Sequence, residues 1–324
     1  MELIANSNQV IPTEQVITSV SEGNFIEANT EQVALNHLQK KCIIPVFSKD
    51  NESTISHYQF ISKAKEVVQG LFPDLLVKEP NIRVSHVVKG RIPSAIGKPA
   101  KELLEHEKTI YYERCAFLID IPEIKQIVNG NELSLSVGGV RAYNQENLYS
   151  KKSMEKFKVF IGFKNQVCTN LCIATDGFSN EIRIASINEL SDKMSNLFSG
   201  YNKEKHLGNM ERMNMFQLSE SQFAHFIGKL RMYQYLDKPT QNKVFPLTLN
   251  DSQVNKVVKD YFECPNFGRN SEGSINLWNL YNLCTEANKS SYIDSNFERN
   301  VNAYELINNL GNSLQNSTPN WLLT

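Results

Sequence analysis

The stretch KFKVFIGFK, Lys156 to Lys164, alternates between apolar residues and residues that are mostly cationic. Successive side chains of a β-strand point to opposite faces of a sheet, so one set is predicted to face a core and the other to face solvent. The stretch therefore predicts a half-buried strand at the centre of the fold. The core set is Phe157, Val159, Ile161 and Phe163, and the other set is Lys156, Lys158, Phe160, Gly162 and Lys164.

Further strand patterns lie on both sides of this stretch. Residues 82–88 alternate with period two, which places His86 on the apolar face as a core histidine, and residues 111–121 are rich in aromatic and apolar side chains. Gly138 and Gly139 follow the alternating run 133–137 and indicate a bulge or a close backbone contact. With strands expected at 167–174 and 181–186, about six strands fall in neighbouring pairs, which favours an antiparallel or mixed sheet.

Helical periodicity dominates the rest of the chain. An apolar stripe at 58–72 precedes the strands, and a short helix is expected after Pro99. From residue 187 the apolar spacing becomes helical, and residues 200–216 are interpreted as a connection. Ser219 to Gln222 is predicted to form a capping box, which opens one of these helices. The later helices are expected at 187–198, 223–230, 254–261, 274–288 and 294–311.

These patterns predict an α+β fold with a central antiparallel or mixed β-sheet and a C-terminal helical region. Residues 1–30 are polar and without sustained periodicity, so they are expected to be a largely flexible lead-in. The sheet domain is expected at 31–186. The helical region is expected at 187–324, packed on the sheet or forming a subdomain.

The amino-acid composition indicates the cellular compartment of the protein but not its activity. The chain has 324 residues, of which 41% are hydrophobic, with 34 Lys+Arg against 35 Asp+Glu. It lacks a secretory start and any long apolar run, so a cytoplasmic protein with no membrane partner is expected. The cysteines are then expected to be reduced thiols, and the sequence does not indicate the oligomeric state. These cysteines are Cys42, Cys115, Cys168, Cys172, Cys264 and Cys284.

The charge distribution suggests one candidate surface. Residues 81–170 carry 14 basic and 9 acidic side chains. Cations beside an exposed aromatic ring suit single-stranded nucleic acid, because the cations meet phosphates and the ring stacks on a base. The alternative is an ordinary solvated sheet face, since antiparallel sheets often carry lysines there. The candidate residues are Arg83, Lys89, Arg91, Arg141, Tyr143, Lys151, Lys152, Lys156, Lys158, Phe160 and Lys164.

Catalytic and metal-binding patterns are weak, so no cofactor and no metal are expected. The segment from Gly90 to Lys98 misses the phosphate-loop spacing, and Cys168 with Cys172 has no second ligand pair for zinc. No convincing nucleophile and base set is present. A metal-dependent nuclease would need paired carboxylates with a lysine, and the chain offers these at poor spacing. The residues concerned are Asp74, Asp120, Glu123 and Lys125.

Several segments resemble known families without an assigned activity. Residues 133–144, 157–172 and 275–286 resemble the phage/plasmid-like proteins, whose shared pattern includes Val-Cys-x-Asn and Trp…Asn-x-x-Thr-Glu. Residues 83–86, 90–97 and 290–294 resemble more closely an uncharacterised Bacteroidales family carried on phages and mobile elements. This resemblance covers most of 25–310. The wider family's Ser-His-Asp-Gly is replaced here by residues 145–148, and the resemblance implies a mobile-element context without a defined reaction.

Three functional hypotheses follow. The first is a nucleic-acid-associated accessory protein of a phage or mobile element, of the single-strand-binding or annealing type and without catalysis. The alternative is an interaction protein that binds and inhibits a host defence factor. A weaker alternative is the metal-dependent nuclease.

Overall fold

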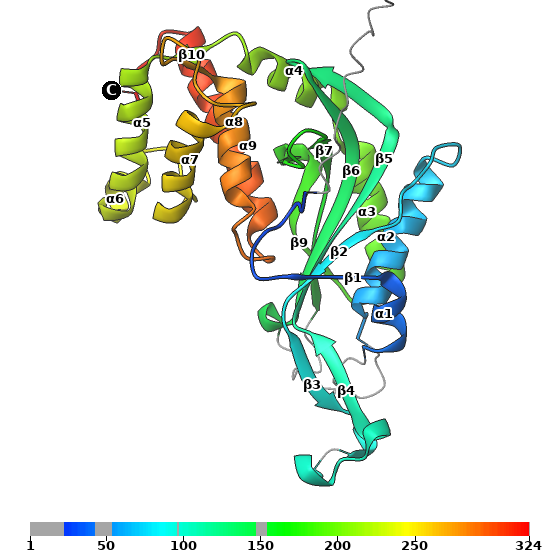
Figure 1. Ribbon diagram of the computed structural model, residues 1–324. Coiled ribbons are helices and arrows are strands. Elements are labelled where there is room, and N and C mark those ends of the chain that lie inside the picture. Colours follow the sequence, from blue (N-terminus) through cyan, green and yellow to red (C-terminus); the bar gives the residue numbers. More distant parts are fainter. Residues whose placement is uncertain (1–22, 43–53, 96, 147–153, 324) are drawn as a thin grey trace, which may run out of the picture.

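A curved antiparallel sheet forms the centre of the protein (Figure 1). The computed structural model describes residues 23–42, 54–95, 97–146 and 154–323. The strand order is β1-β2-β5-β6-β7-β8, and β9 also pairs with β7, so the predicted α+β class with an antiparallel sheet is confirmed. The strands are β1 (Glu31–Val33), β2 (Asn81–Val84), β5 (Arg114–Val128), β6 (Asn131–Ala142), β7 (Glu155–Asn165), β8 (Leu171–Cys172) and β9 (Phe178–Ile184).

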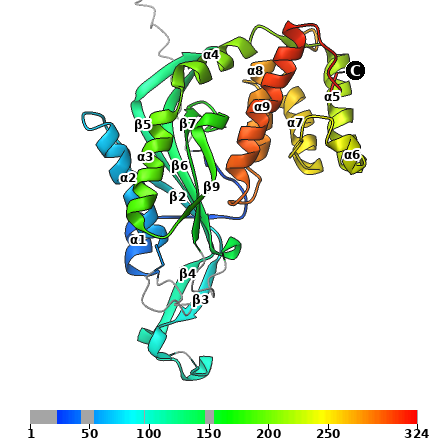
Figure 2. The same ribbon diagram turned by 180° about the vertical axis from the view of Figure 1, so that it is seen from behind.

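One face of the sheet packs against two helices, α2 (His57–Leu71) and α3 (Ile187–Gly200), which lie across it in Figure 2. Ser56 caps α2 in a capping box with Gln59, and this pair of hydrogen bonds fixes the start of the helix. The predicted core set on β7 is buried on this face, which confirms the alternation of that strand. These residues are Phe157, Val159, Ile161 and Phe163.

The opposite face is covered in part by α9 (Asn296–Gln315) and by residues 25 and 26. Phe160 of β7 packs edge-to-face on Phe297 of α9, with 4.6 Å between ring centroids. Gly138 of β6 lies under Phe160, and a Cβ there would meet the ring at 2.4 Å. The paired glycines therefore mark the close contact that the sequence indicated.

The helical region follows β9 and lies beside the sheet (Figure 1). The capping box predicted at Ser219 is present, because the Ser219 hydroxyl accepts a hydrogen bond from the backbone N–H of Gln222, and the Gln222 side chain accepts one from the backbone N–H of Ser219. The connection expected at 200–216 is wrong, since most of it is helical. The elements are α4 (Lys203–Met213), β10 (Gln217–Leu218), α5 (Glu220–Met232), α6 (Lys238–Gln241), α7 (Asp251–Glu263), β11 (Ile275–Asn276), α8 (Leu277–Asn288) and α9.

A two-stranded arm projects from the lower end of the sheet (Figure 1). It consists of β3 (Val87–Arg91), β4 (Lys108–Tyr112) and the tip between them, and α1 (Leu35–Lys40) lies near its base. The sequence predicted continuous strands through 82–88 and 111–121, and this is wrong. Both strands leave the main sheet where Ser85 bonds to Arg114, so the ladder breaks and its two halves diverge.

Other local predictions fail for related reasons. His86 follows the break and is exposed, so it is not a core histidine. The helix expected after Pro99 is two single 3₁₀ turns, Ala100–Glu102 and Glu105–Glu107. The strand expected at 167–174 is reduced to β8, because Thr169 turns the backbone with a φ of 59°. The lead-in prediction does not hold at Phe25 and Ile26, which are buried, and residues 1–22 lie outside the described part.

Candidate nucleic-acid interface

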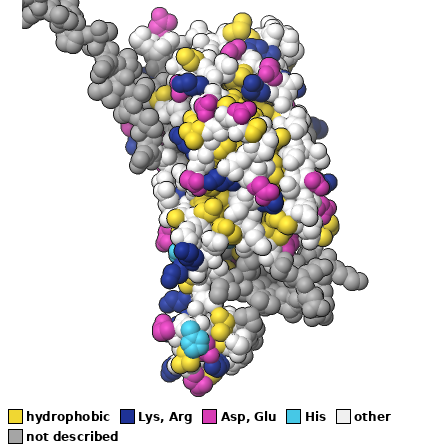
Figure 3. Space-filling model, turned by 90° about the vertical axis from the view of Figure 1, so that its right-hand side faces the viewer, with side chains coloured by type: hydrophobic (Ala, Val, Ile, Leu, Met, Phe, Trp, Pro, Cys, Tyr) yellow, Lys and Arg dark blue, Asp and Glu magenta, His cyan; other side chains and the backbone are white. Residues whose placement is uncertain are grey.

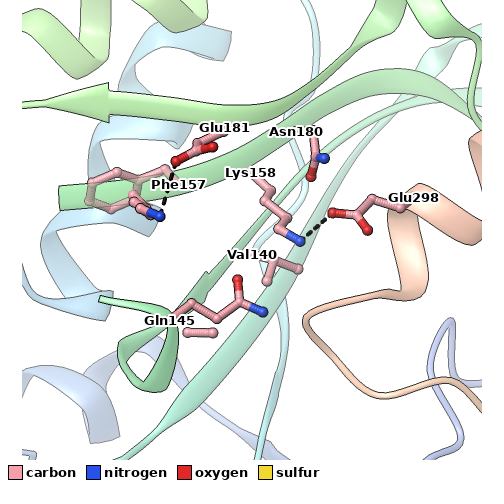
Figure 4. Close-up of a pocket in the computed structure, with 9 residues that line it drawn as sticks. Val140, Gln145, Phe157, Lys158, Asn180, Glu181 and Glu298 are labelled. Carbon is pink, nitrogen blue, oxygen red and sulfur yellow. Dashed lines mark hydrogen bonds and ion pairs between the residues drawn. The ribbon is translucent and has the colours of Figure 1, made fainter. Parts of the chain in front are cut away.

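The face of β7 that was predicted to be solvated lies partly under α9 (Figure 4). Phe160 is fully buried, so it cannot stack on a base in this state. Lys158 points toward α9, where its ammonium group pairs with Glu298 and donates to the backbone oxygen of Asp294 at 2.6 Å. The expectation of an exposed aromatic ring flanked by free lysines is therefore wrong.

The other two lysines of this row also have acidic partners. Lys156 pairs with Glu181 of β9 at 3.1 Å, and Lys164 pairs with Asp120 of β5. The side chain of Lys164 is 14% exposed and that of Lys156 is 37% exposed. The row thus contributes little free positive charge to the surface.

Arg141 and Tyr143 are buried rather than presented to solvent. The guanidinium of Arg141 pairs with Glu146 at 3.1 Å and with Glu155 at 2.7 Å, and it lies over the rings of Tyr143 and Phe157. Burial raises the pKa of the Glu146 carboxyl, although the charge of Arg141 opposes this. The cluster joins the end of β6 to the start of β7 and has a structural role.

The remaining predicted cations divide into three groups. Arg83 is buried and donates to Thr30. Lys151 and Lys152 lie outside the described residues. Lys89 and Arg91 lie on the arm, where Lys89 is exposed and Arg91 half-buried. Of the predicted cations that the structure describes, it therefore brings these last two together on an accessible surface.

A hollow of about 840 Å³ lies between the arm and α1. Lys89 and Arg91 of β3 line it together with Lys108 of β4 and Lys41, which follows α1. None of its described lining residues is acidic. Figure 3 shows Lys and Arg side chains gathered on the upper part of the arm, with acidic, hydrophobic and histidine side chains toward its tip. The "arm hollow" is lined by His37, Lys41, Lys89, Gly90, Arg91, Ala100, Leu103, Lys108, Thr109 and Ile110.

Strand register explains why these cations converge. Lys89 pairs directly with Ile110, and Arg91 pairs directly with Lys108, so these four side chains share one face of the arm. Lys108 forms an ion pair with Glu105. Arg91 instead donates to the backbone oxygen of Lys98, so its contact at this point is with a carbonyl group and not with a carboxylate. No ion pair is found for Lys41 or Lys89 within the described residues. The arm hollow therefore carries a net positive charge.

Sequence reasoning missed His37, Lys41, Leu103 and Lys108. The signal that could have found them is the density of cations between Lys89 and Lys108, which the net charge of residues 81–170 already contained. Lys41 could not have been found in this way, because its approach to the arm depends on a bridge between Cys42 and Ile110.

The carboxylates of the nuclease hypothesis are not brought together. Asp120 pairs with Lys164, Glu123 accepts from the backbone of Leu76 at 2.5 Å, and Lys125 pairs with Glu132. Within the described ranges, no group of three His, Cys, Asp or Glu side chains could hold a metal ion. All six cysteines are free in the structure, and their reduced state stays a prediction.

The motifs that carry the family resemblance meet at a joint between the sheet and α8. The side-chain amide of Asn165 donates to the Asn282 side chain at 3.1 Å, and that of Asn170 donates to the Asn282 backbone at 3.0 Å. Lys289 donates to the backbone oxygen of Cys168 and pairs with Glu286. Buried amides that hydrogen-bond between two elements hold them in register, so these residues have a structural role, although the Oδ1 atom of Asn170 has no partner among the described residues.

The fold and the arm hollow define an α+β protein with a basic two-stranded arm. The chain belongs to the family described as "Domain of unknown function, B. Theta Gene description (DUF3871)", whose model matches residues 4–323. No curated protein and no solved structure matches the chain. Among the helices of the described residues, none combines the length and hydrophobicity that a membrane span requires.

Proposed function

We propose that this protein binds single-stranded nucleic acid through the arm hollow, without catalysis, as an accessory protein of a phage or mobile element. The observation that carries the proposal is the convergence of Lys41, Lys89, Arg91 and Lys108 on one hollow whose described lining contains no carboxylate. The mobile-element context rests on the sequence resemblance described above.

Phosphate is the natural partner of such a surface. Several cations that face one open hollow attract a polyanion and release its condensed counterions on binding. Arg91 offers the planar guanidinium that suits phosphate oxygens, while the lysines act as mobile point charges. The carboxylates of the arm lie toward its tip, where Glu107 pairs with Lys98 and Glu105 pairs with Lys108.

This proposal moves the interface from the sheet to the arm. The row on β7 has its charges neutralised by Glu181, Glu298 and Asp120. A phosphate there would have to break an existing ion pair, whereas Lys41 and Lys89 are exposed and have no carboxylate partner among the described residues. The arm is therefore the favoured surface for an electrostatic partner.

The proposal is tested by fluorescence anisotropy with a labelled single-stranded oligonucleotide at about 50 mM salt, where electrostatic binding is strong. The triple variant Lys41→Ala, Lys89→Ala, Arg91→Ala is expected to lose most of the affinity. The matched control is Lys205→Ala, Lys238→Ala, Lys259→Ala, which removes equal charge from exposed positions of the helical region and is expected to bind normally.

Absence of binding by the folded wild type would refute the proposal. It would favour instead the interaction protein that acts on a host defence factor. Equal losses in the triple variant and in its control would show that only net charge matters, and this too would contradict a specific arm interface.

A further inference from the structure

The floor of the arm hollow is apolar although its rim is cationic. Ala100 and Leu103 come from the tip of the arm, and Ile110 comes from β4. Leu103 and Ile110 are half-buried, so part of each side chain stays open to the hollow. A phosphate group would gain no binding free energy from such a floor, because the hydrophobic effect stabilises only ligands that bury apolar surface of their own.

The hollow is also lined by a flat ring. His37 of α1 lines the hollow, and its Nε2 lies 3.0 Å from the hydroxyl of Tyr112, which is buried. This hydrogen bond fixes the position of the imidazole before any ligand arrives. An imidazole is one of the rings on which unpaired bases stack in nucleic-acid complexes.

The strands of the arm are held close beneath this space. A Cβ on Gly90 would meet the hydroxyl of Thr109 at 2.8 Å, so a larger residue there would push the strands or the Thr109 side chain aside. The volume of the hollow, about 840 Å³, lies in the range of sites that enclose a compact organic ligand.

We propose that the arm hollow seats one unpaired base of the bound strand, with its ring between His37 and the floor formed by Leu103 and Ile110. The adjoining phosphates lie on Lys89, Arg91 and Lys41. This inference rests on the proposed function and adds to it the class of ligand: a strand whose bases are free. A base inside a duplex has both faces covered by its neighbours, and it cannot enter without unstacking.

The chemistry of the lining also sets the specificity. Among the described lining residues, His37 and Thr109 are the uncharged side chains with a hydrogen-bonding group, and none is an amide or a carboxylate. Asn and Gln read adenine edges, Asp and Glu read cytosine edges, and Arg and Lys read guanine edges. Because the proposal places the cations of the lining on phosphates, the seat is expected to accept any of the four bases, with affinity set mainly by ring contact.

The test compares an intact oligothymidine with an abasic oligonucleotide of equal length and charge, both measured against the wild-type protein. The intact strand is expected to bind about tenfold tighter, the scale of one stacked base. A duplex of equal length is expected to bind more weakly than the intact strand. The double variant His37→Ala, Leu103→Ser should bind both strands with the affinity that the wild type shows for the abasic strand.

The outcomes separate the two proposals. Equal affinity for intact and abasic strands in the wild type would overturn the base seat and leave the phosphate interface standing. No affinity for either strand would overturn both. Thymidine monophosphate that competes as strongly as the oligonucleotide would show that a free nucleotide is the ligand and would overturn the strand-bound seat. The wild-type comparison decides the question even where the double variant fails to fold.

Discussion

Two basic stretches of this protein share one sequence pattern but differ in how far the folded structure covers them. On β7, Lys156 and Lys158 alternate with apolar residues, and on β3, Lys89 and Arg91 do the same. The first stretch lies partly under α9 and its lysines are paired with acids, whereas the second lies on an arm whose cations face a hollow. Alternation thus determines which side chains share a face, and later elements of the chain determine what covers that face.

The difference arises from the number of neighbouring strands with which each of the two strands pairs. β7 pairs with β6, β8 and β9, so it lies within the sheet and both of its faces are available for packing. β3 pairs with β4 in a separate two-stranded sheet. A two-stranded ribbon has too little apolar surface to attract a covering layer, so its polar groups stay in solvent.

The largest effect is expected at the buried arginine. Arg141→Met removes the cation and leaves Glu146 and Glu155 buried beside each other, which should cost about 3–5 kcal/mol of folding free energy. Urea denaturation of the wild type and the variant measures it. A loss below about 1 kcal/mol would show that Arg141 is exposed, as the sequence first indicated, and would weaken the contrast between the two stretches.

The next test compares the loss of stability when one apolar side chain is truncated on the covered face of β7 and one on the arm. Phe160→Ala removes the ring that packs on Phe297 and should cost about 3–5 kcal/mol. Leu104→Ala, at the tip of the arm, should cost less than about 0.5 kcal/mol, because that side chain is 55% exposed. Similar losses in both variants would contradict the described covering of β7.

A smaller effect is expected from pH. Burial lowers the pKa of His206 from 6.5 to about 3, and the ring lies between Phe163 and Tyr304 where the helical region meets the sheet. The unfolded chain takes up a proton below pH 6.5 that the folded chain excludes until about pH 3. Stability is therefore complete above pH 6.5 and falls as the pH drops, by about 2 kcal/mol at pH 5.

Urea denaturation across this pH range measures the effect. His206→Gln should make the dependence shallower, because glutamine does not titrate in this range; the part due to His57, whose pKa burial also lowers to about 3, should remain. An unchanged slope in the variant would show that His206 is solvated and that the helical region does not close over this part of the sheet.

The sequence predicts the fold class well because local signals agree with packing. Strict alternation on β7 identified the buried set, and the capping box at Ser219 identified the start of α5. The sequence could not show that α9 covers Phe160, because this contact joins residues 137 positions apart (297 − 160). It could not show the arm either, since the main ladder ends beside Ser85 and Arg114, which are far apart in the sequence.

The candidate site follows the same division. Lys89 and Arg91 were found from charge alone, and they remain at the surface. Arg141, Tyr143 and Phe160 were chosen by the same criterion and are buried, because charge and aromatic content do not reveal depth. Lys41 was missed, since it reaches the arm hollow through tertiary contacts.

The salt dependence of single-strand binding tests the central claim most directly. Each phosphate contact contributes a log–log slope of about −0.7, so Lys89→Ala with Arg91→Ala should make the slope shallower by about 1.4. Lys158→Ala should leave it unchanged, because that lysine is paired with Glu298. A slope that changes with Lys158→Ala and not with the arm variant would contradict the account and return the interface to the sheet.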